Sequence, residues 1–170
     1  AAQATGQSAA TLRTSLKLTT VPDGLRYFAV VGYDDAGNAS ALSNVRSYTV
    51  DLTPPAFTIS YNQSMPVGPG TLGVTVTASE PLVAAPLLLM RPAGGGLVSV
   101  TLTGAGGNNY SASFPVTTLV ARTGIAAIAI SGTDLAGNSF TGPPAGPALD
   151  FDLTKPTAAL TPSRLGPVQT

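Results

Sequence analysis

The chain has 170 residues, of which only 9% are charged, and its formal net charge is zero. This neutral composition lacks the excess of basic residues that would indicate binding to nucleic acid or to an anionic membrane. The sequence contains no Cys and no His, which removes the usual thiol nucleophile, general base and zinc ligands. We therefore expect a protein that is not an enzyme and has no nucleic-acid partner.

Strand signals run along the whole chain, whereas no stretch has the 3.6-residue periodicity of a capped helix. With 44% hydrophobic residues the chain can form a core, and 19 Gly and 15 Pro indicate many turns. Runs rich in β-branched and aromatic residues predict strands at 26–33, 46–50, 57–61, 72–78, 86–90, 97–103, 110–116, 124–131 and 148–153. Short strands joined by turns predict an all-β protein built of antiparallel immunoglobulin-like β-sandwich modules.

Alternation along two of these runs indicates which residues face the core. In LGVTVTA (72–78) apolar residues and threonines alternate, as a half-buried strand requires. The run GIAAIAIS (124–131) offers a second apolar face. We predict that two sets face each other across the core: Leu72, Val74 and Val76, and Ala126, Ile128 and Ile130.

No segment looks like a leader or a membrane anchor. The start, AAQATGQSAA, lacks the basic region and the apolar core of a signal peptide. The longest apolar run, PLVAAPLLLM (81–90), is about half as long as a membrane span and contains two prolines. We expect no membrane span here, and an export signal that lies outside this segment.

A short acidic cassette occurs twice, as DDAGN (34–38) and as DLAGN (134–138), and each copy is followed by an Asp-Leu-Thr segment, at 51–53 and 152–154. An internal repeat of about one sandwich domain in length indicates tandem modules. The repeat predicts three parts: the C-terminal part of a module at 1–53, a complete module at 54–153 and the start of another at 154–170. Residues 1–53 are expected to lack the strands that close a sandwich.

Six of the eight acidic residues lie in these cassettes, in the Asp-Leu-Thr segments or, for Asp150, just before the second of those segments. Two interpretations of them are open. In the first, each Asp before Ala-Gly-Asn accepts hydrogen bonds from backbone N–H groups of its own turn, and the Gly supplies a positive φ. In the second, carboxylates, Asn and backbone carbonyls at one pole of the sandwich supply oxygens for Ca²⁺. The candidate calcium ligands are Asp34, Asp35, Asn38, Asp51, Asp134, Asn138, Asp150 and Asp152. This second interpretation predicts that Asp34 converges with Asp51, and Asp134 with Asp152.

Two segments carry a family resemblance. VPDGLRYFAVVGYDDAGNASALSN (21–44) resembles the end of a fibronectin type III domain, with Tyr27 as its tyrosine-corner residue, although Gly32 stands where that family usually has Ala. VTVTASEPL (74–82), ISGTDLAGN (130–138) and the closing DLTKP are similar to bacterial immunoglobulin-like repeats. The resemblance implies a fold, but modules of this kind serve adhesins, filaments, enzyme spacers and envelope proteins alike.

The resemblance and the weakly charged surface predict a non-catalytic structural segment of a secreted or surface-attached bacterial protein: a spacer, an adhesive stalk or a filament component. The alternative is an accessory module of an extracellular enzyme such as a glycosidase or a protease, and the flanking sequence would distinguish the two. The expected partners are neighbouring Ig-like modules of the same chain, with like subunits of a filament or a surface ligand as alternatives. The double proline of DLTPP (51–55) predicts a joint with limited bending.

Overall fold

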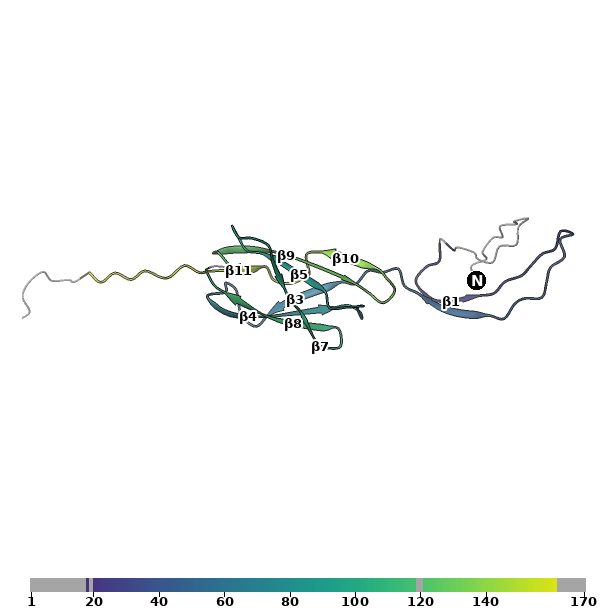
Figure 1. The fold of residues 1–170 in the computed structure, drawn as a ribbon, viewed down its shortest axis with the longest axis horizontal. Coiled ribbons are helices and arrows are strands. Elements are labelled where there is room, and N and C mark those ends of the chain that lie inside the picture. The colour runs from purple at the N-terminus through teal and green to yellow at the C-terminus, as the bar shows by residue number, and fades with distance from the viewer. Residues whose placement is uncertain (1–17, 19, 119–120, 162–170) are drawn as a thin grey trace, which may run out of the picture. The chain divides into compact units, whose positions relative to one another are not determined.

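The computed structural model describes residues 18, 20–118 and 121–161 (Figure 1). The chain divides into two compact units, Ala1–Thr53 and Pro54–Thr170, at the position where the sequence predicts the first module boundary. All pairs of strands are antiparallel, and the described residues contain no helix, so the protein is all-β. Among these described residues, no helix has the length and the apolar character needed to cross a membrane.

In the first unit the structure describes one hairpin, formed by β1 (Gly24–Phe28) and β2 (Arg46–Val50). Beyond β1 the pairing continues through serine side chains. The N–H of Val30 donates to Ser43 Oγ at 2.8 Å, and the N–H of Ser43 donates to the Val30 carbonyl oxygen at 2.9 Å. Because hydroxyl groups replace backbone carbonyls as acceptors there, β1 ends before the predicted limit at residue 33.

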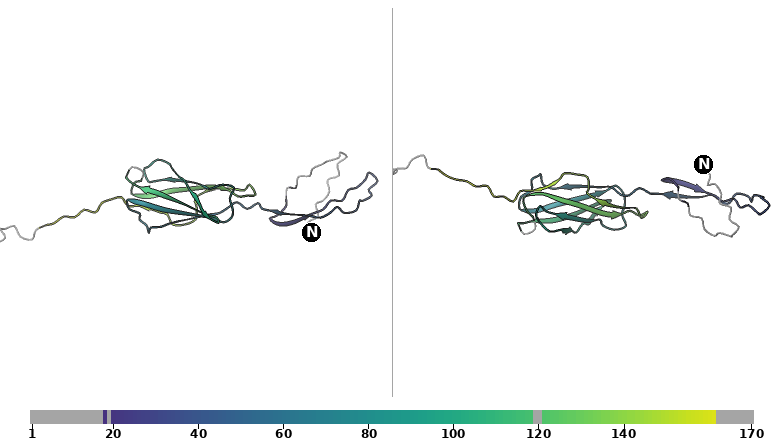
Figure 2. Two further views of the ribbon diagram at one scale, coloured as in Figure 1. Left: turned by 60° about the horizontal axis from the view of Figure 1, so that its bottom comes forward. Right: turned by 90° about the horizontal axis from the view of Figure 1, so that it is seen from above.

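The second unit is a sandwich of two antiparallel sheets (Figures 1 and 2). One sheet has the strand order β3-β4-β8-β7, formed by β3 (Phe57–Tyr61), β4 (Gly70–Ala78), β8 (Asn109–Val116) and β7 (Thr103–Gly106). The other has the order β10-β9-β5-β6, with β11 also paired to β9, formed by β10 (Ser139–Gly142), β9 (Gly124–Thr133), β5 (Leu87–Arg91), β6 (Val98–Val100) and β11 (Leu149–Phe151).

The core lies between these two sheets, and both predicted inward sets belong to it. The three residues of the first set, Leu72, Val74 and Val76, are buried on β4. In the second set, on β9, Ala126 and Ile130 are buried, and Ile128 is half-buried and packs against the same cluster. Since β4 and β9 belong to different sheets, the predicted facing arrangement is confirmed.

The prediction of one continuous strand at 97–103 is wrong, because the chain passes from one sheet to the other within this run. Its first part is β6, which pairs with β5, and its end begins β7, which pairs with β8 in the other sheet. Val100 and Leu102, on either side of the crossing, are both buried. The apolar alternation is therefore kept while the backbone passes from one sheet to the other.

One side of the sandwich is closed by a seam between the first and the last strand segments of the second unit. Both bridges of this seam are parallel, Thr58 with Ala145 and Val67 with Phe151. Four backbone hydrogen bonds form it: Ala145 N–H to Phe57 O and Ile59 N–H to Ala145 O (2.8 Å each), Val67 N–H to Asp150 O (2.8 Å) and Asp152 N–H to Val67 O (3.0 Å). We call this contact the terminal seam.

The chain enters the second unit at one pole and leaves it at the other. Phe57, at the start of β3, lies near the end of β9, since a Cβ on Gly132 would lie 2.7 Å from the Phe57 ring. Phe151, at the end of β11, pairs with Gly124 at the start of β9. We call these two ends of the unit the Asp134 pole and the Gly124 pole. Figure 2 shows that the chain segments that enter and leave the unit lie at these opposite ends.

Candidate functional site: the repeated acidic turns

The turn at 134–138 joins β9 to β10 and is organised by the Asp134 carboxylate. Its Oδ1 accepts hydrogen bonds from the N–H groups of Ala136 and Asn138 (2.8 Å each), and its Oδ2 accepts one from Asn138 Nδ2 (2.9 Å). The backbone closes the same turn, because the Asp134 N–H donates to the Asn138 carbonyl oxygen at 3.0 Å. Gly137 supplies the left-handed conformation that the turn needs, with φ at 94°.

The turn at 34–38 in the first unit has the same set of hydrogen bonds. The Asp34 Oδ1 accepts from the N–H groups of Ala36 (3.0 Å) and Asn38 (2.8 Å), and its Oδ2 accepts from Asn38 Nδ2 (2.8 Å). Gly37 has φ at 86°. The hydrogen bonding predicted by the turn-capping interpretation is thus confirmed in both copies.

The two turns differ in burial. The Asp134 side chain is only 1% exposed, whereas Asp34 is exposed. Burial by itself raises the pKa of Asp134, but the hydrogen bonds led by those from Asn138 outweigh it and hold the pKa below 3.8. The pKa of Asp34 is also lowered, mainly by the side-chain hydrogen bond from Asn38. Both carboxylates are therefore ionised at neutral pH.

The two Asp-Leu-Thr segments also form capped turns. The Asp51 Oδ1 accepts a hydrogen bond from the Thr53 N–H at 3.0 Å, and the Asp152 Oδ1 accepts one from the Thr154 N–H at 2.9 Å. An Asp that binds the backbone two residues further on is the usual Asx turn. These carboxylates, like those of the Ala-Gly-Asn turns, fix the backbone conformation of the residues that follow them.

The predicted convergence of the acids is wrong for both pairs. Asp134 follows the end of β9, while Asp152 follows β11, which pairs with the start of β9. Asp34 and Asp51 likewise lie at the tip and at the base of the β1–β2 hairpin. About ten residues of extended strand, roughly 30 Å, separate the members of each pair. The pairs separate because the last strand runs back along β9, away from the turn.

The remaining predicted ligands lie elsewhere. Asp35 is exposed within the first turn. Asp150 lies in β11, where it is half-buried, and its N–H faces Met65 Sδ at 3.4 Å while its carbonyl oxygen belongs to the terminal seam. Within each unit taken by itself, the predicted acids therefore do not share one site.

Glu80 was not selected from the sequence, yet it lies beside the buried turn. Leu82 forms a bridge with Asp134, and the Val83 N–H donates to the Thr133 carbonyl oxygen at 3.0 Å. This pairing brings carboxylate oxygens of Glu80 and Asp134 within 4.8 Å of each other. Local sequence gives no signal for the contact, because it depends on how the segment after β4 lies against the end of β9.

The chain matches no protein-family model and no curated protein. The resemblance to fibronectin type III and bacterial immunoglobulin-like modules therefore stays a prediction, based on the residues quoted above.

Titration with calcium distinguishes the turn-capping interpretation from the calcium interpretation. The Asp34 and Asp134 carboxylates each accept three hydrogen bonds within their own turns, and their predicted partner acids are distant. We expect about 5 mM Ca²⁺, above the 10⁻⁴ to 10⁻³ M affinities of extracellular modules, to leave the melting temperature unchanged, with Mg²⁺ as the control. A saturable, calcium-specific rise that disappears in Asp134→Asn would instead support the calcium interpretation.

Proposed function

We propose that this chain is a non-catalytic, load-bearing spacer segment of a secreted or surface-attached multi-domain protein. Its partners are neighbouring modules of the same chain, as the repeated cassettes suggest. The observation that carries the proposal is the course of the chain through the second unit. Force on the two ends of this unit acts between the Asp134 pole, near Phe57, and the Gly124 pole, near Phe151.

The terminal seam lies between these two ends and resists their separation. Its two segments run parallel, one leading into the unit and the other leaving it. Pulling the ends apart slides the segments past each other, so the four hydrogen bonds are loaded in shear and share the force. Although a single backbone hydrogen bond contributes only about 1 kcal/mol net, bonds that must break together resist more than bonds that open in turn.

Other features of the second unit support a passive mechanical role. Pro54 and Pro55 precede β3, and Pro55 is buried, which stiffens the chain where it enters the unit. The connection at the Asp134 pole is held by a buried carboxylate rather than left as an open loop. The lack of Cys and His in the sequence also supports a role without histidine-based or thiol-based catalysis.

A substitution in the seam tests this role. Ala145→Pro removes one N–H donor from the seam at an exposed side chain, and Ala145→Ser keeps the donor. When the full chain is pulled from its termini at constant force, we expect Ala145→Pro to shorten the lifetime of the second unit about tenfold. Ala145→Ser should match the unsubstituted chain. Equal lifetimes for the two variants would show that the seam carries no load.

A further inference from the structure

The outward sides of the two sheets in the second unit differ in chemistry. On the four-stranded sheet, β4 and β8 turn threonine and serine outward, as in the pair Thr75 and Ser111, which suits a surface in contact with water. On the other sheet, β5 and β9 turn apolar residues outward: Leu87, Leu89, Ile125, Ala127 and Ala129. Leu87 is 49% exposed and Ile125 is 65% exposed. We call these five residues the outer apolar face.

Both strands have the sequence pattern of strands that are covered on two sides. The runs LLLM in β5 and IAAIAI in β9 are continuously apolar, which is typical of strands buried on both faces. Within the second unit, the core that includes Leu88 and Ile130 covers their inward side. The pattern therefore indicates that another molecule covers the outer apolar face.

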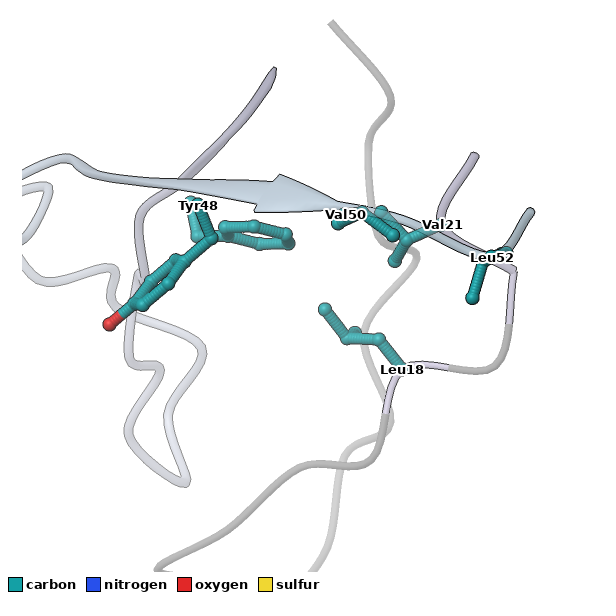
Figure 3. Close-up of a pocket in the computed structure, with 6 residues that line it drawn as sticks. Leu18, Val21, Tyr48, Val50 and Leu52 are labelled. Carbon is teal, nitrogen blue, oxygen red and sulfur yellow. The ribbon is translucent and has the colours of Figure 1, made fainter. Parts of the chain in front are cut away.

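The first unit also has an apolar surface, but its lining does not select a partner. A groove of about 440 Å³ is lined by Leu18, Val21, Phe28, Tyr48, Val50 and Leu52. The labelled lining side chains gather on one side of β2 (Figure 3). All six lining residues are uncharged, so the described residues do not show what covers this groove. The outer apolar face differs, because two charged residues flank it.

Arg91 and Asp150 flank the outer apolar face near the Gly124 pole and have opposite charges. Arg91, at the end of β5, pairs with Ala127, and Asp150, in β11, pairs with Ile125. Paired residues of antiparallel strands point to the same side of a sheet, and residues two apart in one strand do so too. Both charged side chains therefore point outward, like Ile125 and Ala127.

The two charged residues lie on opposite sides of β9. The strands β5 and β10 use different edges of β9, because both pair with its residues 130 and 131. The strand β11 continues along the β10 edge, since its partners at 124–126 follow those of β10, at 130–133, in the direction in which the chain runs. Arg91 is therefore one strand away from β9 on one side, and Asp150 is one strand away on the other.

We propose that the outer apolar face binds the same face of a second copy of this chain, related by a two-fold axis that runs along β9. Every contact in such a symmetric pair occurs twice. Rotation about this axis exchanges the two sides of β9, so Arg91 of each copy comes opposite Asp150 of the other. The two residues are offset by two positions along the strands, about 7 Å, which an arginine side chain can span. The two copies then run in the same direction, and their pairing does not depend on the load-bearing role.

The two charges disfavour other occupants of this face. A two-fold axis across the strands at Ala129 would reverse the second copy and place Arg91 over Leu87, which leaves both guanidinium groups buried without a partner. The apolar interior of a lipid bilayer would likewise bury Arg91 and Asp150 away from water. Among these arrangements, the axis along β9 is the one that pairs each charge with its opposite.

Sedimentation equilibrium of the full chain tests for the dimer. Four adjacent strands about 25 Å long give roughly 500 Å² on each copy, which is near the lower limit for specific interfaces. We therefore expect a dissociation constant on the order of 10⁻⁴ M. Leu89→Lys, at the centre of the face, should weaken the dimer by at least about tenfold.

The matched control is Thr75→Lys, which adds the same charge to the outward side of the other sheet. It should leave the dimer unchanged. A chain that stays monomeric up to about 1 mM, well above the expected dissociation constant, would overturn the proposal. Equal effects of the two substitutions would overturn it as well, because the association would then not use the outer apolar face.

A charge exchange tests the two-fold pairing itself. Arg91→Asp and Asp150→Arg each place like charges opposite each other, so each should weaken self-association by at least about tenfold. An equimolar mixture of the two variants should recover the dimer, because every Asp then faces an Arg. Circular dichroism shows whether each variant is folded. A mixture of folded variants that stays monomeric would overturn the pairing of Arg91 with Asp150.

Discussion

Gly146→Ala should destabilise the second unit by about 2–4 kcal/mol. Gly146 has φ at 141°, and a Cβ there would overlap the carbonyl oxygen of Ile59, which is backbone and has little room to move. The strain falls beside the terminal seam, where Ala145 pairs with β3. Urea unfolding followed by circular dichroism measures the change.

The matched control for this substitution is Gly96→Ala. A Cβ at Gly96 would meet nothing within 4 Å, and Gly96 has no positive φ. We expect its free energy of unfolding to stay within about 0.5 kcal/mol of the unsubstituted chain. If Gly146→Ala were equally neutral, the close approach of residue 146 to β3 would be contradicted.

Asp134→Ala should lower the melting temperature of the second unit by roughly 5–10 °C. The substitution leaves three donors at the Asp134 pole without their acceptor, in a turn whose Asp is only 1% exposed. Asp34→Ala removes the same three hydrogen bonds from an exposed turn in the other unit. Asp34→Ala is therefore the control, and it should leave the melting temperature of the second unit unchanged. An unchanged melting temperature in Asp134→Ala would contradict the structural role of the buried carboxylate.

The lowered pKa of Asp134 also sets a pH dependence. Because the folded-state pKa lies below 3.8, the ionised carboxylate stabilises the fold above that pH, and this stabilisation is lost as the pH falls through the folded-state value. The melting temperature should therefore drop as the solution is acidified below about pH 4, and Asp134→Asn should show a shallower drop. Identical slopes for the two proteins would contradict the role of the ionised carboxylate.

Local features of this fold could be predicted from the sequence. The bounds of β2 and β3 agree with the predicted runs, because apolar alternation there ends at Asp and Pro or at polar turn residues. The hydrogen bonds of the two acidic turns were also predictable. They span only two to four residues, so the position of Asp relative to Gly and Asn determines them.

Features that depend on pairing between distant segments were not predictable. The strand β10, with the sequence SFTG, has weak strand propensity and forms because β9 lies beside it. Ala145 lies in PPAGP, which looks like a loop, yet it pairs with β3. The separation of Asp134 from Asp152 and the approach of Glu80 to Asp134 have the same origin, because strand direction and register decide them.

The load-bearing role is tested most directly by pulling the second unit in two directions. The chain has no native Cys, so a single Cys placed at Leu135, which is 70% exposed at the Asp134 pole, gives a unique handle. Pulling from the two termini loads the terminal seam in shear. Pulling between the N-terminus and residue 135 instead applies force at one pole, so that hydrogen-bonded pairs of residues break one after another. We expect a severalfold higher unfolding force in the first direction. Equal unfolding forces in the two directions would contradict the proposal that the seam makes this module a load-bearing spacer.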